Sequence, residues 1–142
     1  MTTRTRRTEI TYIKHRRNNK NVGCPFCRFE VNDNQVVHEG KEFWIVKNIF
    51  PYDLWENLEV LDHLMIVPKR HVDSLHHFTP TELEEYTMTL AKYDKQGYST
   101  YGRTSKNVAK TIAHQHTHLL KLGDRPAKAL FFLRKPYILW RW

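Results

Sequence analysis

Three histidines alternate with other residues near the end of the chain, at His114, His116 and His118, and two apolar residues follow them. On a β-strand, side chains two positions apart lie on the same face, with about 6.6–6.8 Å between their Cα atoms. The spacing therefore predicts three imidazoles along one surface of a sheet. With an unperturbed pKa of about 6.5, an imidazole can serve as nucleophile, proton carrier or metal ligand at neutral pH. An exposed histidine stripe without chemistry is the alternative for this spacing alone.

Two cysteines, Cys24 and Cys27, are the only ones in the chain. A Cys-x-x-Cys pair is typical of a metal site or of a thiol-redox centre. A redox centre of the thioredoxin type needs a buried strand before the pair, whereas the polar residues 18–21 precede it here. Unmetallated thiols remain an alternative, and the histidines must decide whether a metal site is complete.

The strands that must position these residues follow from local signals. β-Branched and aromatic residues flank a polar break at Gly40, so residues 36–38 and 43–46 are predicted to form two strands joined by a tight turn. The apolar run at 64–67 ends at Pro68 and predicts a strand buried on both faces.

A helix and a further strand follow along the chain. Thr79, Pro80 and Glu82 form a capping-box pattern with proline at the first helical position, and the helix is predicted to end near Gly97. Residues 111–122 return to strand-like alternation. The order hairpin, strand, helix, strand predicts an α+β domain with a mainly antiparallel sheet.

Positive charge is concentrated at the amino terminus. The chain has 142 residues and a formal net charge of +8, and residues 1–20 hold seven of its 23 Lys and Arg but one of its 15 acidic residues. We expect residues 1–22 to be a basic flexible arm and residues 23–142 to form a single domain, with a basic and aromatic extension at about 123–142. The ordinary composition, with 40% hydrophobic residues, excludes fibrous and wholly disordered classes.

Membrane insertion is not expected. No apolar run approaches the ~20 residues that span a bilayer, and the first residues lack the apolar stretch of a secretory signal. We therefore expect an intracellular, cytoplasmic protein, with organelle import through the arginine-rich arm as the minor alternative.

Several motifs together resemble the histidine-triad (HIT) family. The His-x-His-x-His pattern at 114–118 is its signature, the block from His63 to His71 is similar to its upstream element, and residues 48–52 look like the segment that leads into its nucleotide pocket. The resemblance covers residues 23 to about 122. It implies a HIT-like fold, in which a mainly antiparallel sheet of about five strands carries a long helix and extends across a homodimer.

The resemblance also implies chemistry at the α-phosphorus of a nucleotide. His116 would be the nucleophile that forms a covalent nucleotidyl-histidine, with His118 and His63 binding the phosphate oxygens or the neighbourhood of the nucleophile. Thr111 matches a residue that contacts the phosphate or leaving group in relatives, and Asn48 matches one that holds the ribose. For Thr111 an ordinary strand residue, and for Asn48 a turn-forming residue, are the alternatives.

Zinc-bearing members of the family imply a second site. There the two cysteines are joined by the histidine after the basic block and by the first triad histidine, which gives a structural Cys2His2 zinc site from Cys24, Cys27, His71 and His114. His38, His76 or His77 are alternative ligands.

Departures from the family pattern leave other functions open. Asp62 stands where relatives have glycine, residues 52–62 form a longer connection, and the loop 103–110 lacks glycines but carries three basic residues. Of these, Lys110 is a candidate phosphate ligand, with a solvated basic face as the alternative. Diadenosine polyphosphates, phosphoramidates and adenylylated compounds are the expected substrates. The alternatives are a dinucleoside-polyphosphate phosphorylase or nucleotidyltransferase, and a non-catalytic zinc-containing module that contacts nucleic acid through its basic arm.

Overall fold

The computed structural model describes residues 4–19, 23–126, 130–134 and 137–141. The elements run in the order α1 (Arg6–Asn18), η1 (Pro25–Arg28), β1 (Val36–Glu39), β2 (Phe43–Lys47), β3 (Leu54–Trp55), β4 (Leu58–Pro68), η2 (Leu75–His77), α2 (Pro80–Asp94), β5 (Tyr98–Gly102), β6 (Thr117–Pro126), β7 (Leu130–Arg134) and β8 (Tyr137–Arg141). Within the described residues, no helix is both long and apolar enough to cross a membrane.

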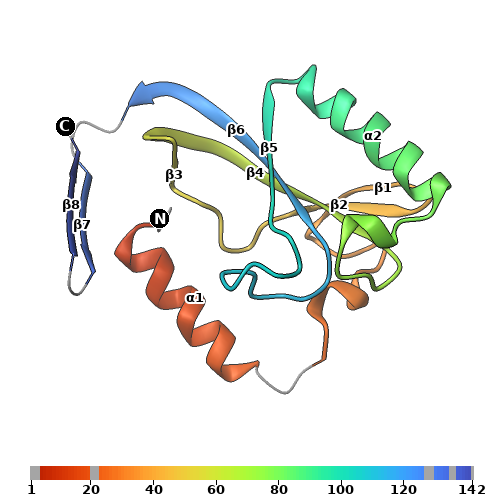
Figure 1. Ribbon diagram of the computed structural model, residues 1–142, viewed down its shortest axis with the longest axis horizontal. Coiled ribbons are helices and arrows are strands. Elements are labelled where there is room, and N and C mark those ends of the chain that lie inside the picture. Colours follow the sequence, from red (N-terminus) through yellow and green to blue (C-terminus); the bar gives the residue numbers. More distant parts are fainter. Residues whose placement is uncertain (1–3, 20–22, 127–129, 135–136, 142) are drawn as a thin grey trace.

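The architecture is α+β, built on an open antiparallel sheet (Figure 1). The strand order is β1-β2-β4-β6-β5, and β3 pairs with β4 outside this path, so the sheet has six strands. Strands β7 and β8, which lie in the predicted C-terminal extension, form a separate two-stranded sheet. The predicted fold class is confirmed, although the strand count exceeds the expected five because β3 arises inside the long connection 52–62.

The predicted hairpin and central strand are confirmed. β1 and β2 pair around the turn at Gly40, and β4 lies between β2 and β6 with its last six residues buried. β4 nevertheless begins six residues earlier than the apolar run predicts. Its extra length pairs with β3 across a turn in which Glu56 and Asn57 have φ of 50° and 68°. Because neither residue is glycine, the sequence carries no strong turn signal there.

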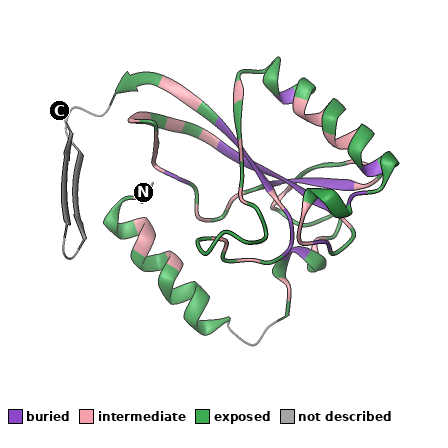
Figure 2. Cartoon of the chain, in the orientation of Figure 1, coloured by how far each residue is buried: buried purple, intermediate pink, exposed green. Residues whose placement is uncertain are grey.

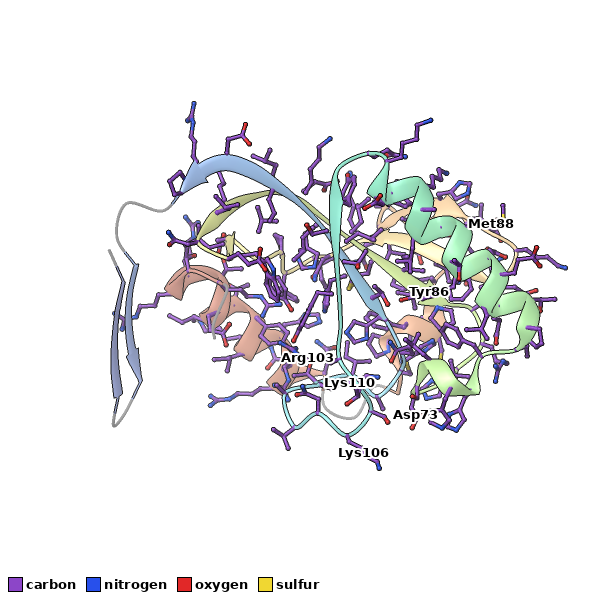
Figure 3. All side chains as sticks on the ribbon, turned by 45° about the horizontal axis from the view of Figure 1, so that its top comes forward. Asp73, Tyr86, Met88, Arg103, Lys106 and Lys110 are labelled. Atoms are coloured by element: carbon purple, nitrogen blue, oxygen red, sulfur yellow. The ribbon has the colours of Figure 1, made fainter. Side chains whose placement is uncertain are left out.

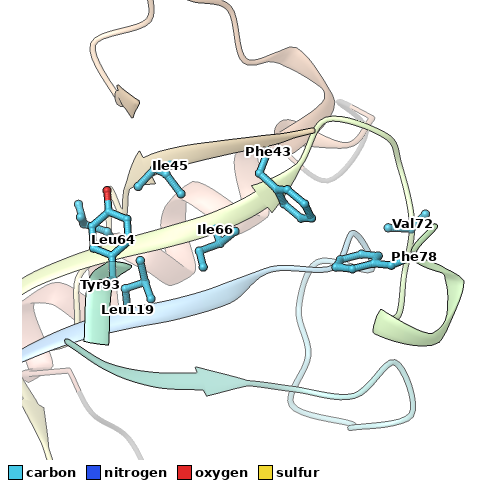
Figure 4. Packing of buried hydrophobic residues seen from close by; sticks show 8 residues of the cluster. All are labelled: Phe43, Ile45, Leu64, Ile66, Val72, Phe78, Tyr93 and Leu119. Carbon is cyan, nitrogen blue, oxygen red and sulfur yellow. The ribbon is translucent and has the colours of Figure 1, made fainter. Parts of the chain in front are cut away.

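Helix α2 packs against one face of the sheet over the larger apolar cluster, whose residues are drawn in Figure 4. The capping box is present as predicted, since the Thr79 hydroxyl accepts from the Glu82 N–H and the Glu82 carboxylate accepts from the Thr79 N–H. The cluster comprises Phe43, Ile45, Leu64, Ile66, Val72, Phe78, Tyr93 and Leu119. Figure 2 shows the buried residues concentrated where β2, β4 and β6 cross the centre of the sheet.

The opposite face carries a smaller apolar cluster and helix α1. Phe26 of η1 packs there against Trp44, Val46, Met65 and Val67 of the sheet. Helix α1 lies on this side, away from α2 (Figure 1).

The segment expected to be a flexible arm therefore contains a 13-residue helix. None of the α1 residues is buried, and the helix contacts the domain through polar and aromatic side chains. An apolar helical stripe is the signal that periodicity detects, and α1 lacks one.

Strand β6 begins at Thr117, later than the strand predicted from residue 111. The prediction that three histidines lie side by side on one strand is accordingly wrong, because His114 and His116 precede the strand and only His118 belongs to it. Because both residues lie outside the strand, they need not follow its alternation. The His114 ring lies toward the cysteines, and the His116 ring forms a hydrogen bond to the His114 carbonyl.

Candidate functional site

His116 is held by a backbone hydrogen bond that fixes its tautomer. Its Nδ1 lies 2.8 Å from the backbone oxygen of His114, and a carbonyl only accepts, so Nδ1 carries the proton. The other ring nitrogen, Nε2, is then left with its lone pair. The half-buried ring lies 5.1 Å from the ring of Phe26 and 5.1 Å from that of His118, each in an edge-to-face arrangement.

A chain of hydrogen bonds fixes the tautomers of two further histidines. The Tyr52 N–H donates to His63 Nδ1 at 3.0 Å, so the proton of His63 is on Nε2. That nitrogen lies 2.9 Å from Nδ1 of His118, which therefore accepts, and the proton of His118 is on its own Nε2. The site thus combines one free imidazole lone pair, on His116, with one imidazole N–H donor, on His118.

The environment of the three histidines lowers the pKa of each ring and so favours its neutral form. Burial is the main cause that lowers the pKa of His63 from 6.5 to about 3; the charge of Arg4 adds to it, and so does that of His116 once His116 is protonated. Burial also holds the pKa of His118 well below 6.5. The pKa of His116 is lowered by burial too, and the positive charges of Lys110 and Arg103 act in the same direction, while the bond to the His114 carbonyl opposes them.

In the basic loop 103–110, Arg103 and Lys110 turn toward the domain and Lys106 points away from it (Figure 3). Arg103 donates to the Tyr101 hydroxyl and to the Ala109 carbonyl, both at 3.1 Å. The Lys110 ammonium donates to the Asp73 carbonyl at 2.6 Å and to the Gln115 side-chain oxygen at 2.8 Å. Lys106 is exposed. In the structure Lys110 therefore braces the segment before β6, and its role as a phosphate ligand stays a prediction.

The structure places Thr111 and Asn48 at the edges of the histidine group. Thr111 is exposed, and its Oγ1 accepts a hydrogen bond from the Tyr12 hydroxyl of α1 at 2.8 Å. Asn48 Oδ1 accepts from the Phe50 N–H at 2.9 Å, which is the turn-forming use weighed as its alternative, while Asn48 Nδ2 lies 3.2 Å from His63 Nε2. The ribose contact of Asn48 and the phosphate contact of Thr111 remain predictions.

A cavity of about 360 Å³ opens beside His63, at the edge of β4 that β2 leaves uncovered. It is lined by residues of the loop 48–53 and of β4, with Lys47 at its rim: Lys47, Asn48, Pro51, Tyr52, Asp53, Glu59, Val60, Leu61, Asp62 and His63. This volume lies within the range typical of small-ligand sites.

Cys24, Cys27, His71 and His114 converge on one point. One ligand atom from each lies within 4.8 Å of every other, although the four come from three separate segments of the chain. His71 Nδ1 is 3.1 Å from the Cys27 sulfur, and His114 Nδ1 is 3.4 Å and 3.5 Å from the sulfurs of Cys24 and Cys27. A tetrahedral zinc site with metal–ligand bonds of about 2.0–2.3 Å separates its ligands by roughly 3.3–3.8 Å, so these residues are close enough to hold a metal ion.

The tautomer of His114 also suits a metal ligand. Its Nε2 lies 2.9 Å from the Pro68 carbonyl and carries the proton, which leaves Nδ1 unprotonated toward the cysteines. Burial is the main cause that lowers the pKa of His114 to about 4, so the ring is neutral, as ligation requires. The alternative ligands His38, His76 and His77 do not belong to this cluster.

The sequence did not indicate that aromatic rings and an arginine contact the histidines, although Tyr52 belongs to the segment 48–52 noted above. The Tyr52 ring lies 4.6 Å from that of His63 and 5.3 Å from that of His118, and the Tyr101 ring lies 5.9 Å from that of His118. Arg4 was missed as well, and its guanidinium lies 4.9 Å above the Tyr52 ring. None of these residues stands at a diagnostic spacing, because their proximity is created by the fold.

Comparison with known proteins supports the fold. No family model matches the chain. The chain is similar to the HIT family hydrolase from Legionella pneumophila Philadelphia 1, with 24% identity over 72% of this chain and 93% of that one and a TM-score of 0.52.

A HIT family hydrolase from Clostridium thermocellum shares 20% identity over 77% of this chain and 98% of its own, with a TM-score of 0.55. The diadenosine triphosphate hydrolase of Plasmodium falciparum, solved in complex with cyclomarin A, shares 12% identity over 71% of this chain and 69% of its own, with a TM-score of 0.54. At these identities the likeness shows the fold, and the predicted HIT-like fold is therefore confirmed.

Proposed function

We propose that this chain is a HIT-family nucleotidyl hydrolase or transferase that cleaves its substrate at the α-phosphate through a covalent intermediate on His116. The observation that carries the proposal is the hydrogen bond from His116 Nδ1–H to the His114 carbonyl, which leaves Nε2 free to act as the nucleophile. The HIT-like fold and the neutral state of the three histidines support it.

In the first step, the Nε2 lone pair of His116 attacks the α-phosphorus. The bond from nitrogen to phosphorus forms as the bond from phosphorus to the leaving group breaks, and the leaving atom, oxygen in a polyphosphate or nitrogen in a phosphoramidate, departs with the electron pair. The imidazole becomes positively charged, and its Nδ1–H remains bonded to the His114 carbonyl, which stabilises this charge. The Nε2–H of His118 is available to donate to a phosphoryl oxygen as negative charge develops there.

In the second step, an acceptor releases the nucleotide. With water as acceptor, the water oxygen bonds to phosphorus, the bond to His116 breaks with its electron pair returning to Nε2, and the water proton passes to solvent. Phosphate or a sugar phosphate in place of water gives the phosphorylase and transferase alternatives. The low pKa of His118 keeps this residue neutral, so it acts as a hydrogen-bond donor without carrying a charge of its own.

Zinc is the metal we propose for the Cys2His2 cluster of Cys24, Cys27, His71 and His114. Two sulfur and two imidazole ligands at these separations match a closed tetrahedral site, which zinc fills in a structural role. When bound, the ion would tie the segment that contains Phe26 to the segment that carries the nucleophile. The remaining expectations from the resemblance, a homodimer and a cytoplasmic location, are retained as proposals.

The proposed function can be tested by trapping the intermediate. The full chain is mixed with α-labelled diadenosine triphosphate, adenosine 5′-phosphoramidate or ADP, with and without phosphate, and quenched at alkaline pH. We expect a protein-bound, acid-labile label on His116 and release of AMP, or of ADP where phosphate is the acceptor. The matched control is His38→Ala, which removes an exposed histidine of β1 and should leave labelling unchanged.

His116→Ala should abolish the label and lower turnover by about 10⁴-fold or more, as loss of a nucleophile does. The absence of label and of turnover across the substrates would contradict the enzyme proposal. Salt-sensitive binding of nucleic acid that survives in His116→Ala would then favour the non-catalytic module.

A further inference from the structure

The N-terminal helix α1 contacts the domain beside the catalytic histidines. At its C-terminal part, the Tyr12 hydroxyl donates to Thr111 Oγ1 at 2.8 Å, and the Tyr12 ring meets the ring of Phe50 at 5.5 Å. The ring of His15 also contacts Phe50, at 4.9 Å. Phe50 belongs to the loop whose Tyr52 N–H sets the tautomer of His63.

The other end of α1 is fixed to the same loop. Arg4 donates through two guanidinium nitrogens to the Phe50 carbonyl, at 3.1 and 3.0 Å, and the Thr5 N–H donates to the Asp53 carboxylate. The Arg4 guanidinium lies 4.4 Å over the Tyr12 ring and 4.9 Å over the Tyr52 ring. Glu9 lies 3.8 Å from it and offsets part of its charge. Helix α1 therefore extends from the loop beside His63 to the loop before His116.

The direction of the bond between Tyr12 and Thr111 has a chemical consequence. Because the Tyr12 hydroxyl donates, Thr111 Oγ1 accepts, and the proton of the Thr111 hydroxyl is left to donate elsewhere. Accepting one hydrogen bond polarises a hydroxyl and strengthens the bond that it donates. Thr111 is exposed and precedes the triad by three residues, so its hydroxyl proton is open to a ligand from solvent.

We propose that α1 belongs to the substrate site, and that Tyr12 is a positioning residue which orients the Thr111 hydroxyl toward the phosphate or leaving group of the nucleotide. This inference rests on the proposed function and adds to it a part of the chain that lies outside the region of family resemblance.

The structure offers a matched control on the other face of the sheet. Tyr86 of α2 and Thr117 of β6 also form a hydroxyl–hydroxyl pair at 2.8 Å. Both pairs join a helix tyrosine to a threonine near the start of β6, but the pair at Thr117 lies on the face away from the catalytic histidines. Tyr→Phe at either position removes one hydroxyl and keeps the ring.

The test is a double-mutant cycle on kcat/KM with the labelled nucleotide that the chain turns over. We expect Tyr12→Phe to lower kcat/KM by about 3- to 10-fold, the effect of one hydrogen bond, and Thr111→Val to lower it at least as much. If Tyr12 acts through Thr111, the double variant loses no more than Thr111→Val alone. Tyr86→Phe should stay within about twofold of the unmodified chain.

Three results of this cycle would overturn the inference. Tyr12→Phe within twofold of the unmodified chain would show that the hydroxyl has no role. Losses that multiply in the double variant would show that Tyr12 and Thr111 act independently. An equal loss in Tyr86→Phe would assign the effect to packing.

Amide hydrogen exchange, measured with and without AMP, distinguishes failure of this inference from failure of the proposed function. We expect AMP to slow amide exchange in residues 6–18, and Tyr12→Phe to remove that protection. Binding of AMP without protection of α1 would overturn the inference while the His116 adduct still supports the proposed function. Protection of α1 without any adduct or turnover would support α1 as part of a binding site and overturn the hydrolase. No AMP binding at all would overturn both.

Discussion

The two α-helices lie on opposite faces of the sheet and are attached to it by different forces. Helix α2 covers a cluster of eight buried apolar residues, and a complete capping box starts it. Helix α1 buries none of its residues and has no side-chain cap, and its contacts are hydrogen bonds, ring contacts and a guanidinium over two aromatic rings. Apolar packing therefore holds α2 on its face of the sheet, whereas polar and aromatic side chains hold α1 on the other face.

The same contrast extends to the clusters beneath the helices. The apolar cluster on the face that carries His63 and His118 has five buried residues, and the Cys2His2 cluster lies next to it through Phe26 and Cys24. A metal ion there would replace part of the stabilisation that the α2 face obtains from apolar packing. Four experiments test this difference between the two faces of the sheet.

Metal removal should have the largest effect on stability. A metal ion present at about 1,000 times its dissociation constant contributes about 4 kcal/mol to the free energy of unfolding. Chelation should therefore lower the midpoint of thermal unfolding by roughly 10 °C or more in a chain of this length. Calorimetry of the zinc-loaded and chelated chain measures the shift. An unchanged midpoint, with loss of the metal verified by elemental analysis, would contradict a structural metal at the Cys2His2 cluster.

The next largest difference is expected between truncations of one side chain on each face, measured as the loss in the free energy of unfolding. Ile66, which is 1% exposed, lies in the cluster under α2, and Ile66→Ala should cost about 2–5 kcal/mol in the free energy of unfolding. Tyr12→Ala, on α1, should cost less than about 1 kcal/mol because no α1 residue is buried. Urea denaturation of both variants gives the comparison, and similar losses would refute the distinction between the helices.

Acidification should lower the free energy of unfolding, because the buried histidines on the face opposite α2 are neutral in the fold. Burial lowers the pKa of His63 to about 3 in the fold, against 6.5 for a free side chain. Between pH 6.5 and 3, this side chain is therefore protonated in the unfolded chain and neutral in the folded chain. Its contribution is complete above pH 6.5 and is lost as the pH falls toward 3, which amounts to about 2 kcal/mol between pH 7 and 5.

The measurement is the free energy of unfolding at pH 7 and pH 5 for the unmodified chain and for His63→Gln. The variant should lose less stability between the two pH values, and His38→Gln, at an exposed position, should behave like the unmodified chain. An identical pH dependence in all three chains would show that His63 is not held neutral.

The helix caps should give the smallest difference. Thr79→Ala removes the hydroxyl that caps α2 and should cost about 1 kcal/mol. Thr5→Ala should cost less than about 0.5 kcal/mol, because the Thr5 side chain makes no cap hydrogen bond at the start of α1. Chemical denaturation resolves the two values, and an equal cost would mean that α1 contributes to the folded core.

Local signals predicted the parts of the fold that local interactions determine. The hairpin at Gly40, the strand that ends at Pro68 and the capped helix at Pro80 are all present. Helix α1 could not be predicted this way because its contacts are with residues about 40 to 100 positions away. Strand β3 was missed because Glu56 and Asn57 take left-handed backbone conformations without glycine.

The candidate site was predictable in its residue types and less so in its geometry. Spacing selected the cysteines and histidines, and the resemblance grouped them as the structure does, with four around one point and His63 bonded to His118. The strand model for residues 114–118 failed because alternation cannot reveal where a strand begins. Lys110 and Thr111 were selected from charge and position, whereas their actual partners, Gln115 and Tyr12, depend on the folded loop.

His114 serves two sites through different parts of one residue. Its side chain faces the cysteines, and its backbone carbonyl accepts the hydrogen bond from His116 Nδ1–H. Since every amino acid has a backbone carbonyl, replacing the His114 side chain would remove a proposed metal ligand but leave the hydrogen-bond partner of His116 in the chain. In evolutionary terms, a single substitution at this position would remove one of the four proposed metal ligands. The tautomer of His116 would not change with that substitution, because it is set by a backbone carbonyl.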